Sequence, residues 1–168
     1  YNESFNILRK KYEIFPKKSQ LNYVYRLLKY NKDITPLREL EDILITKKMR
    51  SESGVLVISV IMPPDNFSCS YDCYYCPNDP KYSRSYYKGE PTVQRGERNN
   101  FDAYKQFFER AMCLFINGHN IDKVELIILG GTFSCYDPKI AENFIKELFY
   151  AANNVFEDQL ELRPRLSI

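Results

Sequence analysis

The chain has 168 residues, of which 44% are hydrophobic and 15% aromatic. This length fits one ordinary domain and supplies enough apolar side chain for a core, which excludes an intrinsically disordered protein. The net charge is only +2, but residues 1–50 carry 12 Lys and Arg against 6 Asp and Glu. We call residues 1–50 the front segment. Its excess of basic residues predicts a polyanionic partner, and the alternative is that these residues form a solvated helical surface.

The cysteine content and the chain start bear on the compartment. The five cysteines are an odd number, and three of them share one short stretch. This pattern does not make a disulfide framework, so we expect a reducing, cytoplasmic compartment. No apolar run is long enough to span a membrane, and the start resembles no signal peptide. The first residue is Tyr1 rather than methionine, which fits a piece of a longer chain.

Residues 1–50 follow a helical pattern that Pro16 and Pro36 interrupt, with Ser19 as the expected cap of the second helix. Tyr and Phe alternate here with Lys and Arg. This mixture suits stacking on bases and pairing with phosphates. A small helical subdomain whose lysines lie along apolar surface is the alternative.

The rest of the chain alternates predicted strands and helices. Residues 55–62 are β-branched and almost continuously apolar, which predicts a strand buried on both faces, and residues 124–129 predict a second buried strand. Residues 63–100 show no periodicity and predict a long functional loop. Apolar residues at helical spacing predict one helix from Phe101 to the stop at Asn117-Gly118, and Asp137-Pro138 open another.

The long loop contains Cys69, Cys73 and Cys76, separated by three and then two residues. Thiolates this close together can hold an iron–sulfur cluster. A structural zinc site would need a second ligand pair, and inert buried thiols would show no particular spacing. The remaining candidates, Cys113, Cys135 and His119, form no such pair. Three ligands where four are needed leave an open position, which is typical of catalytic metal centres.

Gly130-Gly131 directly follow the second predicted strand. Paired glycines let the backbone approach a ligand closely, although a simple turn is the alternative. Alternating strands and helices predict right-handed βαβ units in a parallel sheet or barrel, with ligand sites at the carboxyl ends of the strands. The cysteine loop and the glycine pair both belong to that edge.

The cysteine spacing, with Tyr74 and Tyr75 before the last cysteine, resembles the motif of the radical S-adenosylmethionine (SAM) superfamily. A closer resemblance, to the family of the catalytic subunit of Elongator, covers nearly the whole chain. It is carried by an ordered set of motifs, namely Lys48 to Gly54 with the following strand, Cys69 to Pro80, Ser85-Tyr86 with Glu90-Pro91, Arg95 to Asp102, Gly118 to Glu125, and Gly130 to Phe133.

This resemblance implies an α/β fold, a partial (β/α) radical SAM barrel with only its first βα units, preceded by a small basic helical segment. Residues 1–50 would be the tRNA-binding segment and residues 51–168 the N-terminal part of the radical SAM domain. The rest of the barrel and the acetyltransferase-like domain of the family would be missing. We therefore expect a fragment or a reduced homologue that is inactive by itself, because two βα units cannot close a barrel.

The resemblance also implies a reaction. A 5′-deoxyadenosyl radical made from SAM would attack the acetyl group of acetyl-CoA, and the product would be 5-carboxymethyluridine at the wobble position of tRNA. Cys69, Cys73 and Cys76 would hold a 4Fe-4S cluster whose fourth iron binds SAM. By their positions in the matching motifs, the residues beside SAM would be Tyr75, Gly130, Gly131 and Thr132. Lys123 matches a lysine that is linked to acetyl-CoA in the family. The alternative for Lys123 is an ordinary surface lysine.

The expected partners are tRNA and either other Elongator-type subunits or a second copy of the chain, with no membrane. Candidate contacts to tRNA phosphates are basic residues: Lys17, Lys18, Lys47, Lys48, Arg50, Arg95 and Arg98. Two other functions remain open. One is a different radical SAM enzyme acting on RNA, and the other is a non-catalytic RNA-binding module that uses the cysteines for a structural metal.

Overall fold

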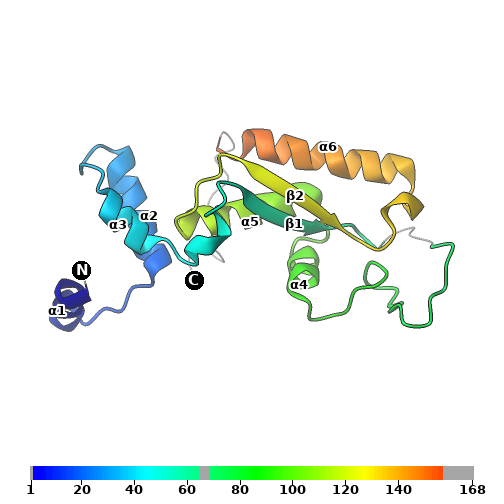
Figure 1. Cartoon of the computed structure of the whole chain (residues 1–168), viewed down its shortest axis with the longest axis horizontal. Coiled ribbons are helices and arrows are strands. Elements are labelled where there is room, and N and C mark those ends of the chain that lie inside the picture. The colour runs from blue at the N-terminus through cyan, green and yellow to red at the C-terminus, as the bar shows by residue number, and fades with distance from the viewer. Residues whose placement is uncertain (1, 65–68, 157–168) are drawn as a thin grey trace.

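The computed structural model describes residues 2–64 and 69–156, so four residues of the predicted loop and residues 157–168 of the predicted second domain lie outside the described residues. The described part is a mixed α/β structure (Figure 1). Its elements are α1 (Asn2–Tyr12), α2 (Lys18–Tyr30), α3 (Arg38–Leu44), η1 (Lys48–Arg50), β1 (Leu56–Ile61), α4 (Pro91–Arg98), α5 (Ala103–Ile116), β2 (Val124–Leu129), η2 (Phe133–Cys135) and α6 (Pro138–Asn154).

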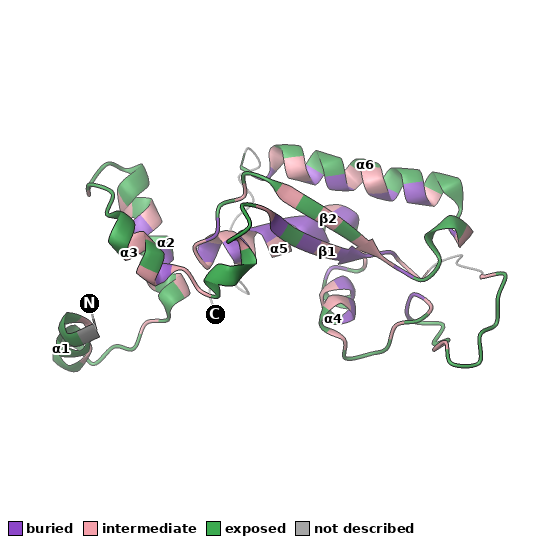
Figure 2. Cartoon of the chain, viewed as in Figure 1, coloured by how far each residue is buried: buried purple, intermediate pink, exposed green. Residues whose placement is uncertain are grey.

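The two strands form a parallel pair in which Leu56 lies opposite Val124 and Ile61 opposite Leu129. Both predicted strands are therefore present, and α5 connects them as a βαβ unit. Helices α5 and α6 share one core with β1, in which Phe107, Leu114 and Leu148 are buried. Figure 2 shows the buried residues as purple segments of the ribbon, most of them along β1 and on the helices that cover the sheet. The alternating pattern of the sequence thus determines the order and direction of these elements.

The prediction of an unbroken loop over residues 63–100 was wrong, because α4 forms at its end. Pro91 occupies the first turn of α4, where a missing backbone N–H costs nothing. Only Val93 and Gly96 of this helix are buried, against Ile61 and Phe101. One apolar side chain in eight residues leaves no periodic signal, which explains why the sequence pattern missed the helix.

The second strand is less buried than its apolar sequence predicts, since Ile127 is 38% exposed. The physical reason is its position, because β2 has one strand neighbour among the described residues. The outer edge of β1 is instead closed by a side chain. Ile61 N donates to Gln106 Oε1 at 3.0 Å, and Gln106 Nε2 donates to Ile61 O at 3.0 Å. At Ile61 the Gln106 amide thus makes the two hydrogen bonds that a neighbouring strand would make. Among the described residues no second strand pairs with β2.

The front segment packs on the C-terminal end of α5 through α2. Asn22 Nδ2 donates to Ile116 O at 2.8 Å, and the Arg26 guanidinium stacks 3.9 Å above the Phe115 ring. The prediction that Ser19 caps this helix was wrong, because α2 begins at Lys18 and Ser19 lies inside it. Lys17 is the N-cap, and its backbone N–H donates to Gln20 Oε1 at 2.8 Å. Over the part of the chain that the structure describes, no helix combines the length and apolar character that crossing a membrane requires.

Gly118 ends α5 with φ +99°, and a Cβ there would lie 2.9 Å from Ile45 Cα. We expect Gly118→Ala to lower the free energy of unfolding by about 1–3 kcal/mol through backbone strain, and by more through the clash with the front segment. Urea denaturation measures the loss. Gly89→Ala is the matched control, because Gly89 has φ +102° and no atom within 4 Å of its added Cβ. Equal losses in the two variants would contradict a clash at Ile45.

His119, the single histidine of the chain, is buried where the front segment meets α5. Its Nε2 lies 3.0 Å from Thr46 O, and its Nδ1 lies 2.7 Å from Ser51 Oγ. Because a carbonyl only accepts, Nε2 carries the proton and Nδ1 accepts from the Ser51 hydroxyl. Burial lowers the pKa of His119, and Arg50, Arg110 and Arg26 lower it further, whereas the Thr46 carbonyl opposes the shift.

This lowered pKa predicts a pH dependence of stability. Below about pH 6.5 the unfolded chain binds a proton at His119 that the folded chain still excludes, so acidification favours unfolding. The urea midpoint should therefore fall between pH 7.5 and pH 5.5. In His119→Gln the fall should be smaller, although that variant is less stable at both pH values. An identical fall in wild type and variant would show that His119 does not cause it.

Candidate functional site

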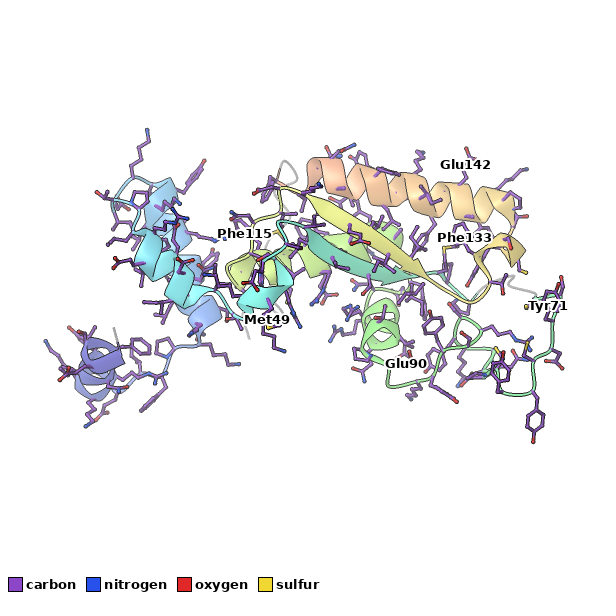
Figure 3. The ribbon with its side chains drawn as sticks, in the orientation of Figure 1. Met49, Tyr71, Glu90, Phe115, Phe133 and Glu142 are labelled. Carbon is purple, nitrogen blue, oxygen red and sulfur yellow. The ribbon has the colours of Figure 1, made fainter. Side chains whose placement is uncertain are left out.

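The carboxyl edge of the two-stranded sheet carries the candidate site. The chain leaves β1 into the cysteine loop and leaves β2 into Gly130-Gly131-Thr132. These two segments meet, because Cys69 Sγ lies 3.8 Å from Thr132 Oγ1. Figure 3 shows Tyr71 of the cysteine loop and Phe133 at this same end of the sheet, with Met49 beyond the opposite end of the sheet. The tertiary structure thus joins two motifs that are far apart in the sequence.

The backbone at Gly130 requires glycine. Gly130 is buried with φ +142°, and a Cβ there would lie 2.8 Å from both Met62 Cβ and Tyr136 Oη. Gly131 follows with φ +55° and is exposed. The first glycine therefore permits close packing between the ends of the two strands. The second presents exposed backbone beside Cys69 and Thr132, where a bound ligand could contact it.

All three cysteines of the loop have free thiols; Cys73 is exposed, whereas Cys69 and Cys76 are partly buried. The backbone N–H of Tyr71 lowers the pKa of Cys69 most strongly, and hydrogen bonds with Thr132 and Cys135 add to this effect against the opposing effect of burial. This environment favours the thiolate, which is the form that binds metals. Cys135 is a neighbour of Cys69 that the sequence pattern did not suggest.

The donor set fits an iron–sulfur cluster by its chemistry, since three unpaired thiols lie on one loop beside an accessible edge. Over residues 2–64 and 69–156, however, no three Cys, His, Asp or Glu side chains lie close enough to hold a metal ion. Cys69 instead contacts Thr132 on the other strand. Binding one cluster through all three sulfurs therefore requires the loop to draw them closer together.

Arg84 is the residue at this site that sequence reasoning missed. Its Nη2 donates to Asp72 Oδ1, and the Asp72 carboxylate and then the Cys76 thiol raise the pKa of Arg84. The Arg84 side chain is 13% exposed. A single arginine in an aperiodic loop gives no signal of such a role, because its partners become neighbours only when the loop folds back.

Two residues predicted for the site do not contribute to it at the carboxyl edge. Tyr75 is 88% exposed, so its ring contributes little to the described site. Lys123 precedes β2 at the amino edge of the sheet, where its carbonyl accepts a hydrogen bond from Leu56 N at 2.9 Å. The whole length of β2 separates Lys123 from Gly130. The structure therefore places Lys123 at the opposite edge from the cysteines.

The predicted tRNA contacts of the front segment lie beyond the amino edge, in the region of Met49 in Figure 3. Lys48 Nζ pairs with Asp42 at 3.2 Å, and Lys18 Nζ donates to Ile43 O at 2.9 Å. Lys17, Lys47 and Arg50 are exposed. Three of the five residues, Lys17, Lys47 and Arg50, are thus exposed cations that form no ion pair with the described residues, which suits a contact with an anion.

Of the two predicted contacts on α4, Arg98 is exposed and Arg95 is turned inward. Arg95 Nη2 donates to Ser59 Oγ and Thr92 Oγ1, both at 2.9 Å. Burial lowers the pKa of Arg95 and of its neighbour Arg110, and Arg110 and Arg98 lower that of Arg95 further. Arg110 Nε is buried and has no acceptor. The three ion pairs of the described residues do not include Arg95, Arg98 or Arg110.

Comparison with known proteins gives a consistent result, although no protein-family profile matches the chain. The chain is 38% identical to the tRNA uridine(34) acetyltransferase of Dehalococcoides mccartyi, over 68% of the chain and 25% of that protein. It is 33% identical to Elongator complex protein 3 of Schizosaccharomyces pombe, over 90% of the chain and 30% of that protein. It is also 38% identical to the tRNA uridine(34) acetyltransferase of Methanocaldococcus jannaschii, over 74% of the chain and 24% of that protein.

The chain thus spans about a quarter of the length of these relatives. Several of them agree in name and in the level of identity, and the match to the Schizosaccharomyces pombe protein, which covers 90% of the chain, includes both motifs that meet at the carboxyl edge. The chain is therefore homologous to part of the family that contains Elongator complex protein 3 and tRNA uridine(34) acetyltransferase.

Proposed function

We propose that this chain is the first part of a radical SAM enzyme that forms 5-carboxymethyluridine at the wobble position of tRNA from SAM and acetyl-CoA. One observation carries the proposal, namely the 3.8 Å contact between Cys69 Sγ and Thr132 Oγ1. In this contact the cysteine loop lies beside the Gly130-Gly131-Thr132 turn, at the edge where parallel α/β proteins bind ligands, which supports a shared site for the cluster and SAM. The relatives named as tRNA uridine(34) acetyltransferases support the choice of substrate.

In this proposal Cys69, Cys73 and Cys76 hold a 4Fe-4S cluster. When bound, the cluster supplies one-electron reduction of SAM. The exposed backbone at Gly131 and the hydroxyl of Thr132 bind and orient the methionyl part of SAM, because no side chain at position 131 blocks the approach. Lys123 stays a predicted acetyl-CoA contact; its place at the amino edge gives it no part in binding SAM.

The basic residues of 1–50, together with Arg95 and Arg98 on α4, would bind tRNA phosphates, and residues 51–168 would carry the chemistry. The relatives named Elongator complex protein 3 support further protein subunits as partners. Because the relatives are about four times longer than the matched region, the activity belongs to the whole protein of which this segment would be a part.

The deciding experiment incubates the full-length protein with tRNA, SAM, acetyl-CoA and a reductant without oxygen. Mass spectrometry of tRNA digests should then show carboxymethyl groups at uridine 34, and omission of acetyl-CoA should abolish them. Modification of another nucleotide would favour the different radical SAM enzyme. Tight RNA binding with no cluster and no modification would favour the non-catalytic module.

We also predict how tRNA affinity depends on salt. Each phosphate that a cation neutralises should contribute about −0.7 to −0.9 to the slope of log affinity against log salt. Charge reversal at Lys47 and Lys48, or at Lys17 and Lys18, should weaken binding of all tRNAs and flatten the slope by about one unit per lost contact. Lys139 and Lys146, exposed on α6, give a control with the same change in net charge. Equal effects of control and test variants would contradict a local contact.

A further inference from the structure

The segment 82–86 is fixed to the carboxyl edge of the sheet. Ser83 is buried and its Oγ donates to Met62 O, directly after β1, at 2.5 Å. Tyr82 belongs to the same buried cluster as Ile61 of β1, and Tyr86 packs against this cluster together with Leu129 of β2. Tyr82 Oη donates to Glu97 on α4 at 2.7 Å. Contacts to the ends of both strands and to α4 therefore hold this segment in place.

Arg84 extends from this fixed segment to the exposed cysteine loop. It pairs with Asp72, whose side chain is 94% exposed and which lies between Cys69 and Cys73 in sequence. The Asp72 carboxylate and then the Cys76 thiol raise the pKa of Arg84, and Arg84 is close enough to Cys69 to help lower the pKa of that thiol. Ser85 N donates to Pro77 O at 3.0 Å and gives a second link to the loop. One side chain therefore joins both ends of the cysteine motif to the sheet.

The chemistry of arginine suits this arrangement. A guanidinium donates several hydrogen bonds in one plane, so it can bind a carboxylate and a sulfur at the same time. Arg84 Nε is buried and has no acceptor among the described residues, which leaves one more donor available. A surface ion pair with both partners exposed would contribute little, whereas here the Arg84 side chain is 13% exposed.

We propose that Arg84 is a positioning residue, which holds the cysteine loop at the carboxyl edge through Asp72 and donates to the sulfur of Cys76. The part of the inference that concerns the cluster rests on the proposed function; the part that concerns the loop does not. A positive donor beside cluster sulfurs stabilises the reduced, more negative state, so Arg84 also raises the reduction potential of the cluster. Outer partners of metal ligands typically change metal affinity by about 10- to 100-fold.

The first test uses the iron-free protein. Chymotrypsin cleaves after Tyr71, Tyr74 and Tyr75, and the cleavage rates of wild type, Arg84→Gln and Lys88→Gln are compared by mass spectrometry. Lys88 is the matched control, because it is exposed and loses the same charge four residues later. We expect several-fold faster loop cleavage in Arg84→Gln only. Equal rates in all three proteins would overturn the tethering role.

The second test uses full-length protein reconstituted without oxygen. Arg84→Gln should lose iron to a chelator about tenfold faster than wild type, and its cluster potential should be more negative. Arg84→Lys keeps the charge but not the planar donor group, so its potential should stay closer to wild type while iron loss remains fast. Iron loss and potential that match Lys88→Gln would overturn the inference. A wild type that takes up no cluster would instead refute the proposed function, and the cleavage test would still decide the tether.

Discussion

Alanine at Cys69, Cys73 or Cys76 is expected to abolish binding of a 4Fe-4S cluster, whereas the wild type should take up about one cluster per chain after anaerobic reconstitution. Each cysteine would supply one of three thiolate bonds, and an open fourth position leaves no spare protein ligand to replace it. Iron and sulfide analysis, together with the absorption spectrum, measures the loss. Activity should disappear with the cluster.

Two other cysteines serve as controls for this prediction. Cys113 lies on α5 beside Asn117, away from the carboxyl edge, so Cys113→Ala should keep the cluster. Cys135→Ala is the sharper control, because Cys135 is close enough to Cys69 to help lower the pKa of that thiol. Loss of the cluster in Cys135→Ala would show that a fourth thiolate closes the site and would contradict an open iron. Tightly bound zinc without cluster uptake would favour the structural metal site.

A side chain at Gly131 is expected to block SAM binding while iron content stays at the wild-type level. Gly131 is exposed with φ +55°, next to Thr132, which contacts Cys69. In Gly131→Val a branched side chain would occupy the space in which we place the methionyl group. Isothermal titration with SAM should show at least a tenfold loss of affinity, about 1.4 kcal/mol.

Backbone strain must be separated from this obstruction, because valine rarely adopts a positive φ. Gly131→Asn provides the control, since asparagine tolerates the left-handed region far better and still adds a side chain. Both variants should lose SAM, and only Gly131→Val should also lose stability in urea. Normal SAM affinity in a folded Gly131→Asn protein would place the SAM site elsewhere.

Local patterns predicted most of the secondary structure correctly because each one has a direct physical cause. The β-branched runs gave β1 and β2, and Asp137 caps α6 as expected, accepting from Lys139 N at 2.8 Å. Patterns failed where long-range contacts decide the outcome. Helix α4 has one large apolar residue, Val93, whose burial depends on Ile61 and on Tyr82 in the long loop. Lys17 replaced Ser19 as a cap because Gln20 supplies the bond to the helix start.

The candidate site was likewise predictable from the sequence only in part. The sequence by itself determined its chemistry, since three cysteines at short spacing and a glycine pair after a buried strand are properties of adjacent residues. Only the tertiary structure decided which residues meet. Parallel pairing of β1 with β2 brings Cys69 to Thr132 across 63 positions of sequence, while the length of β2 keeps Lys123 at the other edge. The role proposed for Arg84 could be recognised only in the tertiary structure. Its burial and the hydrogen-bonded backbone beside it, rather than its residue type, distinguish it from the other arginines.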